Sequence, residues 1–311
     1  MGNSVDGLGL EVTREASTEV LYRKRVATLT LRASASLGRA VTLCEIVDCF
    51  CSTHEEFSPA TIRNYAAALH FAIGEAEGRG EIGADNAATC RVRLVQRPRP
   101  RPRSAETRTS ARKAKSVAPQ VLHAVCQKLR HRGRQDDRLL VHLLVQNITF
   151  GLRPCEYEGA RIEELYLVVR SAKATNGRAV SPTRELGLED LGDHQLQSLN
   201  ALIANVERAA NGDVAALIDR LGARLRRACK SLKVPVFSLY TTRHQAIANK
   251  KSTSSAEVVA AFAGHVSTYT AVKHYAPKGK AWKIDKTAKP SPRMVQLLKD
   301  RKTNGACTPR F

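Results

Sequence analysis

The sequence predicts a mainly α-helical protein with one small antiparallel β-hairpin or sheet, arranged as two domains joined by a basic linker. Three observations support this fold class. Apolar residues recur at the three- and four-residue spacing of a helix face along most of the chain. A single strand-like run is followed by Asn-Gly, a strong hairpin signal. Repeated Arg-Pro pairs interrupt the helical pattern once, and 311 residues are enough for a domain on either side.

A helical N-terminal domain is expected within residues 1–90. Ser58 and Pro59 are typical of a helix start, as an N-cap followed by proline at the first helical position. The helix that they begin carries apolar residues at helical spacing as far as Gly78: Ile62, Ala66, Leu69, Ile73 and Ala76. A shorter apolar helix is expected upstream, over residues 40–51.

Residues 91–118 are predicted to form a linker, because repeated Arg-Pro pairs prevent a regular helix. This stretch contains ten Lys or Arg and one Glu, so its net charge of +9 is nearly half of the chain's +21. A solvated linker is one interpretation. The density of positive charge favours a linker that lies along the phosphates of a nucleic acid.

The second domain is expected over residues 119–311. Two apolar helices lead to Gly151, and a strand over 165–169 then begins a hairpin with its turn at Asn176-Gly177 and its return from Ala179. Two further helices are predicted within 196–206 and 214–232. A capping box at residues 254–257 opens a short helix that Gly264 ends.

The composition indicates a protein that binds a polyanion, because the chain contains 50 Lys and Arg but only 29 Asp and Glu. No stretch approaches the roughly 20 consecutive apolar residues of a membrane span, so a cytoplasmic, nucleoid-associated protein with no membrane partner is expected. The eight cysteines form no CxxC pair and no zinc-type block with histidine, and they are interpreted as small core residues. The chain also lacks a phosphate-binding Gly-rich loop and an acidic cluster at metal spacing, so neither a metal nor a cofactor is predicted.

Several polar residues of the second domain stand where a structural role explains them poorly. Arg153 follows an apolar helix directly and would be half-buried beside an anion or a carboxylate. Lys173 lies at the end of the predicted strand, and Arg243 begins another helix. His265 follows the helix stop at Gly264, and Tyr275 comes ten residues later. Each residue alone has an ordinary explanation, as a surface charge, a cap or a core residue.

In their order and context, these residues resemble the tyrosine recombinases, also called the phage integrase family. That family runs through an arginine in Gly-Leu-Arg-x-x-Glu, a hairpin lysine, His-x-x-Arg, Gly-His and a nucleophilic tyrosine. The matching positions are Arg153, Lys173, Arg243, His265 and Tyr275, over about residues 119–280. The N-terminal helices resemble the family's core-binding domain.

The resemblance implies a site-specific DNA recombinase or integrase, acting as a homotetramer on double-stranded DNA with specific recombination sites, as mobile elements use. Tyr275 would attack a phosphodiester and form a 3′-phosphotyrosyl intermediate. Arg153 and Arg243 would stabilise the charge that develops on the phosphate oxygens. Lys173 would protonate the leaving 5′-hydroxyl. His265 would donate to the phosphate or help to deprotonate Tyr275.

The sequence departs from this pattern at one position. Tyr240 stands three residues before Arg243, where many family members have histidine, and a phenol is not a neutral base near pH 7. Tyr240 is therefore expected to orient the phosphate by a hydrogen bond, and the identity of the base stays open. Tyr269 is a rival nucleophile, but the spacing of Tyr275 and the Ala-Pro after it fit the family better.

The C-terminal segment, residues 277–302, carries nine Lys or Arg and two Asp. It is expected to pack on a neighbouring subunit around Val295, Leu297 and Leu298. Two other functions remain open: a type IB topoisomerase-like or resolvase enzyme with the same site, and a catalytically inactive DNA-binding relative.

Overall fold

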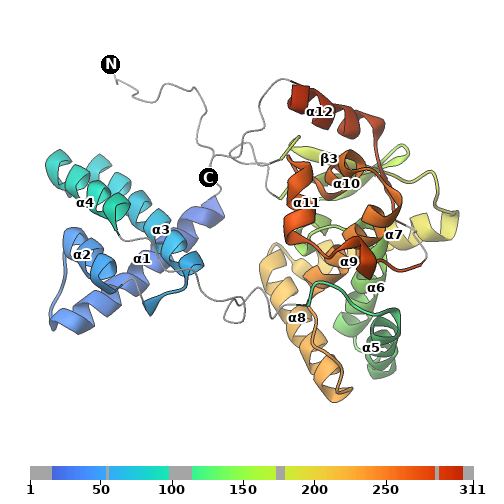
Figure 1. Cartoon of the computed structure of the whole chain (residues 1–311). Helices are drawn as coiled ribbons and strands as arrows, with labels where there is room; N and C mark the ends of the chain where they lie inside the picture. The colour runs from blue at the N-terminus through green and yellow to red at the C-terminus, as the bar shows by residue number, and fades with distance from the viewer. Residues whose placement is uncertain (1–15, 54–55, 98–113, 173–178, 284–286, 304–311) are drawn as a thin grey trace. The chain divides into compact units, whose positions relative to one another are not determined.

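A computed structural model of the chain describes residues 16–53, 56–97, 114–172, 179–283 and 287–303 (Figure 1). The chain divides into two compact units, Met1–Arg112 and Lys113–Phe311. The predicted fold class is confirmed, because the described residues are mostly helical and hold one small antiparallel sheet. None of the helices in these ranges combines the length and apolarity that crossing a membrane requires.

The first unit contains four described helices: α1 (Ala16–Leu37), α2 (Leu43–Thr53), α3 (Pro59–Gly78) and α4 (Ala84–Gln96). The predicted start of α3 is confirmed, since the Thr61 N–H donates to Ser58 Oγ at 3.1 Å. Apolar faces of α1, α2, α3 and α4 meet in one core, whose fully buried members include Val47, Ile62, Leu69, Ile73 and Leu94.

The linker begins later than predicted. Helix α4 continues to Gln96, so residues 91–96 are helical. Leu94 is fully buried in the first unit's core, and this packing extends the helix up to the first Arg-Pro pair. Residues 98–113 of the predicted linker lie outside the described ranges.

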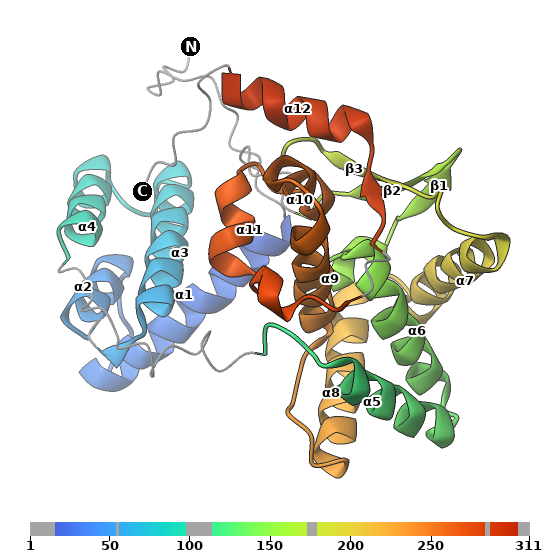
Figure 2. The ribbon, with the colours of Figure 1, turned by 45° about the vertical axis from the view of Figure 1, so that its right-hand side comes forward.

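Helices make up most of the second unit. They are α5 (Pro119–Arg132), α6 (Gln135–Phe150), α7 (Asp193–Ala210), α8 (Val214–Ser231), α9 (Leu239–Thr253), α10 (Ala256–Ala263), α11 (Thr268–His274) and α12 (Pro292–Thr303), with 3₁₀ turns η3 (Pro154–Tyr157) and η5 (Lys278–Lys280). Helix α6 packs against α9, and α5 against α8. Both views of this unit place the sheet and α12 at one end and α5 and α8 at the other (Figures 1 and 2).

The sheet has four strands in the order β1 (Arg161–Glu163), β2 (Tyr166–Arg170), β3 (Thr183–Gly187) and β4 (Lys289–Pro290), each antiparallel to its neighbour. Strands β2 and β3 are the predicted hairpin, but β3 begins at Thr183 and not at Ala179. The predicted Asn-Gly turn lies outside the described residues. Strands β1 and β4 were not predicted because two or three residues carry no detectable alternation.

Helix α12 packs on its own chain. Met294 and Leu298 are both 2% exposed and contact Ala260 and Ala261 of α10. In this single chain α10 covers the apolar side chain of Leu298, and packing of the segment on a neighbouring subunit stays a prediction.

Candidate active site

The site begins where α6 ends. Gly151 takes a left-handed conformation with φ of 58°, and a Cβ there would lie 2.8 Å from the Phe262 ring. The chain then turns into η3, with the Arg153 N–H donating to Glu156 Oε2 at 2.8 Å. Arg153 is 7% exposed, and its guanidinium forms an ion pair with Glu156. Among the described residues, the buried Nε of Arg153 has no hydrogen-bond partner.

Arg243 lies in the first turns of α9 and is fully buried. Its Nη1 donates to the Gly151 carbonyl and its Nη2 to the Ala263 carbonyl, both at 2.6 Å. Its Nε donates to Tyr275 Oη at 3.3 Å. These bonds hold the guanidinium plane fixed between the end of α6, the end of α10 and the tyrosine.

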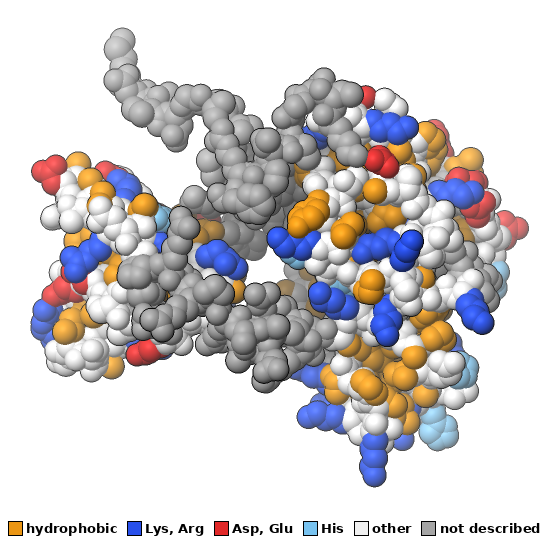
Figure 3. All heavy atoms as spheres, in the orientation of Figure 1, with side chains coloured by type: hydrophobic (Ala, Val, Ile, Leu, Met, Phe, Trp, Pro, Cys, Tyr) orange, Lys and Arg blue, Asp and Glu red, His pale blue; other side chains and the backbone are white. Residues whose placement is uncertain are grey.

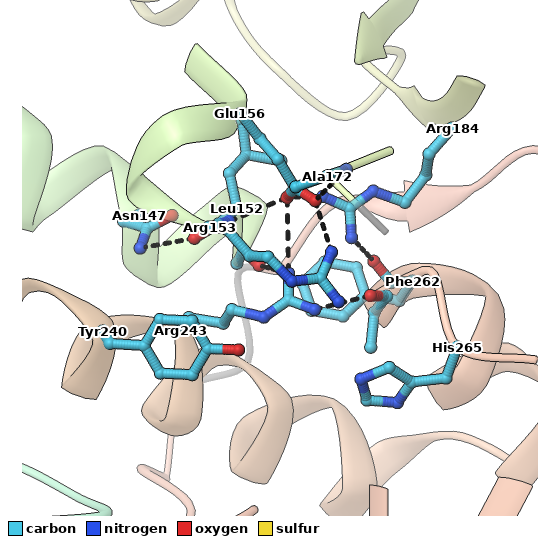
Figure 4. Close-up of polar contacts among 12 residues, drawn as sticks. Asn147, Leu152, Arg153, Glu156, Ala172, Arg184, Tyr240, Arg243, Phe262 and His265 are labelled. Carbon is cyan, nitrogen blue, oxygen red and sulfur yellow. Dashed lines mark hydrogen bonds and ion pairs between the residues drawn. The ribbon is translucent and has the colours of Figure 1, made fainter. Parts of the chain in front are cut away.

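Asn147, in the last turns of α6, joins the two segments that carry these arginines. Its Nδ2 donates to the Leu152 carbonyl at 3.1 Å and to Thr242 Oγ1 at 2.9 Å, and its Oδ1 accepts from Tyr157 at 3.2 Å. Leu152 and Thr242 immediately precede the two arginines, so the amide of Asn147 links the two chain segments that carry them. Figure 4 shows the bond from Asn147 to Leu152.

Glu156 is the one carboxylate that contacts these guanidiniums within the described residues. It pairs with Arg153, with Arg184 of β3 at 2.7 Å and with Arg243 at 3.6 Å (Figure 4). Burial raises the pKa of Glu156, but the charges of the three arginines outweigh burial and lower it to about 2. These four groups therefore keep a net charge of +2, which favours a bound anion.

Tyr275 follows α11 and is 7% exposed. Its hydroxyl lies 2.9 Å from Tyr240 Oη, 3.3 Å from Arg243 Nε and 3.3 Å from His265 Nε2. Burial raises the pKa of Tyr275, but the Arg243 charge and hydrogen bonds with Tyr240 and Arg243 outweigh it, so the pKa is below its usual value. Tyr269, the rival residue, is 59% exposed on α11.

His265 and Tyr240 reach the site from two different elements (Figure 4). Gly264 ends α10 in a left-handed conformation with φ of 63°, as predicted, and His265 follows it with 5% exposure. The N-cap of α10 is Ser255, one residue after the predicted capping serine. Tyr240 lies in the first turn of α9, and burial raises its pKa above the usual value.

Five of the six predicted residues thus meet: Arg153, Tyr240, Arg243, His265 and Tyr275. Lys173 lies outside the described residues. The backbone N–H of Ala172, one residue before it, donates to Glu156 Oε1 at 3.3 Å. The described chain therefore reaches the site as far as Ala172.

Three further residues of the site were missed from the sequence. Arg184 has no motif around it. The His244 ring centroid lies 4.7 Å from that of Tyr275. Burial and the charges of Arg243, Lys115 and Lys251 lower the pKa of His244 to about 4, so the ring is neutral at pH 7. Lys251 Nζ donates to the Ala276 carbonyl at 2.8 Å, next to Tyr275. Of these three residues, only His244 had a signal in the sequence, because it directly follows Arg243.

Metal binding has no visible basis in the part of the chain that the structure describes, where no group of three or more His, Cys, Asp or Glu side chains is placed to hold an ion. The site is instead built from guanidiniums, imidazoles and phenols. Such a set can hold an anion and move a proton.

Comparison with known proteins shows the fold. No family model matches the sequence, and no curated protein matches it either. The structure is similar to that of a lambda integrase(75-356) dimer bound to a COC′ core site, with TM-score 0.52 and 14% identity, over 89% of this chain and 93% of that one. It is also similar to a lambda integrase tetramer bound to a Holliday junction, with TM-score 0.52 and 13% identity, over 88% of this chain and 75% of that one. The chain therefore has the fold of these integrase structures.

Proposed function

We propose that this protein is a site-specific DNA recombinase or integrase that breaks and rejoins strands through a 3′-phosphotyrosyl intermediate. One observation carries the proposal: the hydroxyl of Tyr275 contacts Arg243, His265 and Tyr240 beside a cluster of side chains with net positive charge. The similarity of the fold to lambda integrase structures supports it.

The chemistry follows from the positions of the side chains. Tyr275 Oη attacks the phosphorus, the new O–P bond forms and the bond to the 5′-oxygen breaks. The negative charge that develops on the non-bridging oxygens is stabilised by Arg153 and Arg243, whose orientations are already fixed. The unpaired Nε of Arg153 is a donor available for this purpose.

Proton transfer needs a base for Tyr275 and an acid for the leaving group. His265 Nε2, at 3.3 Å, is the nearest imidazole nitrogen with a hydrogen bond to the phenol and accepts its proton. The 5′-oxygen takes a proton from Lys173, the hairpin lysine of the sequence pattern. Because the phosphotyrosyl bond keeps the energy of the broken linkage, the 5′-hydroxyl of a second strand can reverse the step.

Double-stranded DNA is the proposed partner, bound by a homotetramer. On the face of the second unit in Figure 3, Lys and Arg side chains gather over α9 and α11. The exposed cations near Tyr275 include Lys115, Lys273, Lys278 and Lys280. Two of these follow Tyr275 within five residues, so phosphates bound there would lie beside the nucleophile.

The test is covalent capture on a randomised library of nicked duplexes, in which loss of a short fragment prevents rejoining. Wild-type protein is expected to form an adduct that survives denaturation, and the recovered DNA identifies the site. Tyr275→Phe is expected to form none, whereas the control Tyr269→Phe, in the helix α11 that precedes Tyr275, forms the adduct normally.

The outcomes separate the alternatives. An adduct from Tyr275→Phe would refute the assignment of the nucleophile. DNA binding with no wild-type adduct would indicate an inactive relative. An adduct with relaxation of supercoils but without exchanged flanks would indicate a type IB topoisomerase-like or resolvase enzyme.

A further inference from the structure

We infer that Arg184 is a positioning residue that sets the distance between Arg153 and His265, through Glu156 on one side and the last turn of α10 on the other. This inference rests on the proposed function. Arg184 belongs to none of the motifs in the sequence, and its side chain does not contact Tyr275.

Arg184 is 1% exposed on β3, and its two Nη atoms donate to groups of the protein itself. Burial lowers its pKa to about 10 despite the charge of Glu156, and the group stays charged at neutral pH. A guanidinium is tolerated in such an interior only when its donors are paired. Its Nη2 donates to Glu156 Oε2 at 2.7 Å, and its Nη1 donates to the Phe262 carbonyl at 2.9 Å.

Each of these two contacts leads to a residue of the site. Glu156 also binds the guanidinium and the backbone N–H of Arg153. Phe262 lies three residues before His265, and the next carbonyl, that of Ala263, is held by Arg243. The last carbonyls of a helix carry partial negative charge, which two guanidiniums neutralise here.

The packing leaves Arg184 little freedom. A Cβ at Gly264 would lie 3.3 Å from Arg184 Cδ and 3.4 Å from its Nη1. The side chain therefore lies directly against the glycine that ends α10 and precedes His265. The planar guanidinium of Arg184 binds Glu156 and the Phe262 carbonyl together, and so sets the position of the end of α10 relative to η3. The ammonium of a lysine cannot reach both partners with this geometry.

The test uses Arg184→Met and Arg184→Lys, with Arg170→Met as a control on the adjacent strand, where the side chain is exposed. Each variant is bound to a nicked duplex at saturating protein, and the rate of adduct formation is measured separately from DNA affinity. We expect Arg184→Met to slow adduct formation by up to about 100-fold, as for an ångström-scale misplacement, with unchanged DNA affinity. Arg184→Lys is expected to give an intermediate rate, and Arg170→Met the wild-type rate.

The measurements are made at a temperature where the fluorescence of the single tryptophan, Trp282, reports a folded second unit in every variant. A purely structural role would lower the unfolding temperature and leave the adduct rate of folded protein unchanged, which would overturn the inference. Parallel losses of affinity and rate would do so as well, and so would failure of both variants to fold. If the wild type forms no adduct, the proposed function itself fails.

Discussion

Glu156→Gln removes the one negative charge that contacts three guanidiniums in the described part of the site. In the folded chain these arginines lower the pKa of Glu156 from 4.5 to about 2. A lowering of this size corresponds to roughly 3 kcal/mol in favour of the ionised, folded state. Breaking a buried pair by removing one partner costs about 3–5 kcal/mol, which agrees. We therefore expect Glu156→Gln to lower the free energy of unfolding by about 3 kcal/mol at pH 7.

The assay is urea denaturation followed by the fluorescence of Trp282, the only tryptophan of the chain. Its Nε1 donates to the Val117 carbonyl at 3.0 Å, and its ring packs against the core of the second unit. The signal therefore reports the unit that contains Glu156. Glu163→Gln is the matched control, because its pair with Arg161 is exposed on both sides and contributes less than about 1 kcal/mol.

The pH dependence gives a second, independent check. Because the folded-state pKa of Glu156 is lowered, its contribution is complete above the unfolded-state pKa and is lost as the pH falls toward 2. The difference between wild type and Glu156→Gln should therefore be constant from pH 7 to 5 and fall to roughly half or less by pH 3. A difference below about 1 kcal/mol at pH 7, or one that does not change at acidic pH, would refute this account of the cluster.

Three other predictions concern the nucleophile, the backbone and DNA. Tyr240→Phe removes a hydrogen bond that lowers the pKa of Tyr275. The acidic limb of the pH profile of the adduct-formation rate should therefore move to higher pH. An unchanged profile would show that Tyr240 does not act on the phenol. Gly151→Ala should lower the free energy of unfolding by about 2–3 kcal/mol, and Gly133→Ala by about 1–2 kcal/mol. Both glycines are left-handed, but only a Cβ at Gly151 meets the Phe262 ring. Equal losses in urea titrations would exclude the steric contribution of that ring. DNA binding should weaken on the order of 1000-fold between about 50 and 200 mM salt if six or more phosphates are neutralised, and a flat salt profile would contradict a phosphate-binding surface.

The helices are the part of the fold that local sequence specifies. Ser58 and Gly264 mark helix ends in the structure where the sequence predicted them, because capping depends on a side chain and a backbone conformation within a few residues. The start of the linker was placed too early, since the burial of Leu94 in a core made by other helices extends α4. The short strands β1 and β4 are stabilised by their partner strands and not by their own pattern.

The sequence by itself determined the helical class, the strong positive charge and the order of the polar residues that end at Tyr275, because composition, periodicity and motif order are properties of the chain. Only the tertiary structure decided which of these polar residues meet. It also decided that Glu156 pairs with three arginines, one of which, Arg184, lies on a strand without any motif. The physical reason is that the burial of a charge, and hence its pKa and its partners, is set by segments that the chain brings together from distant positions.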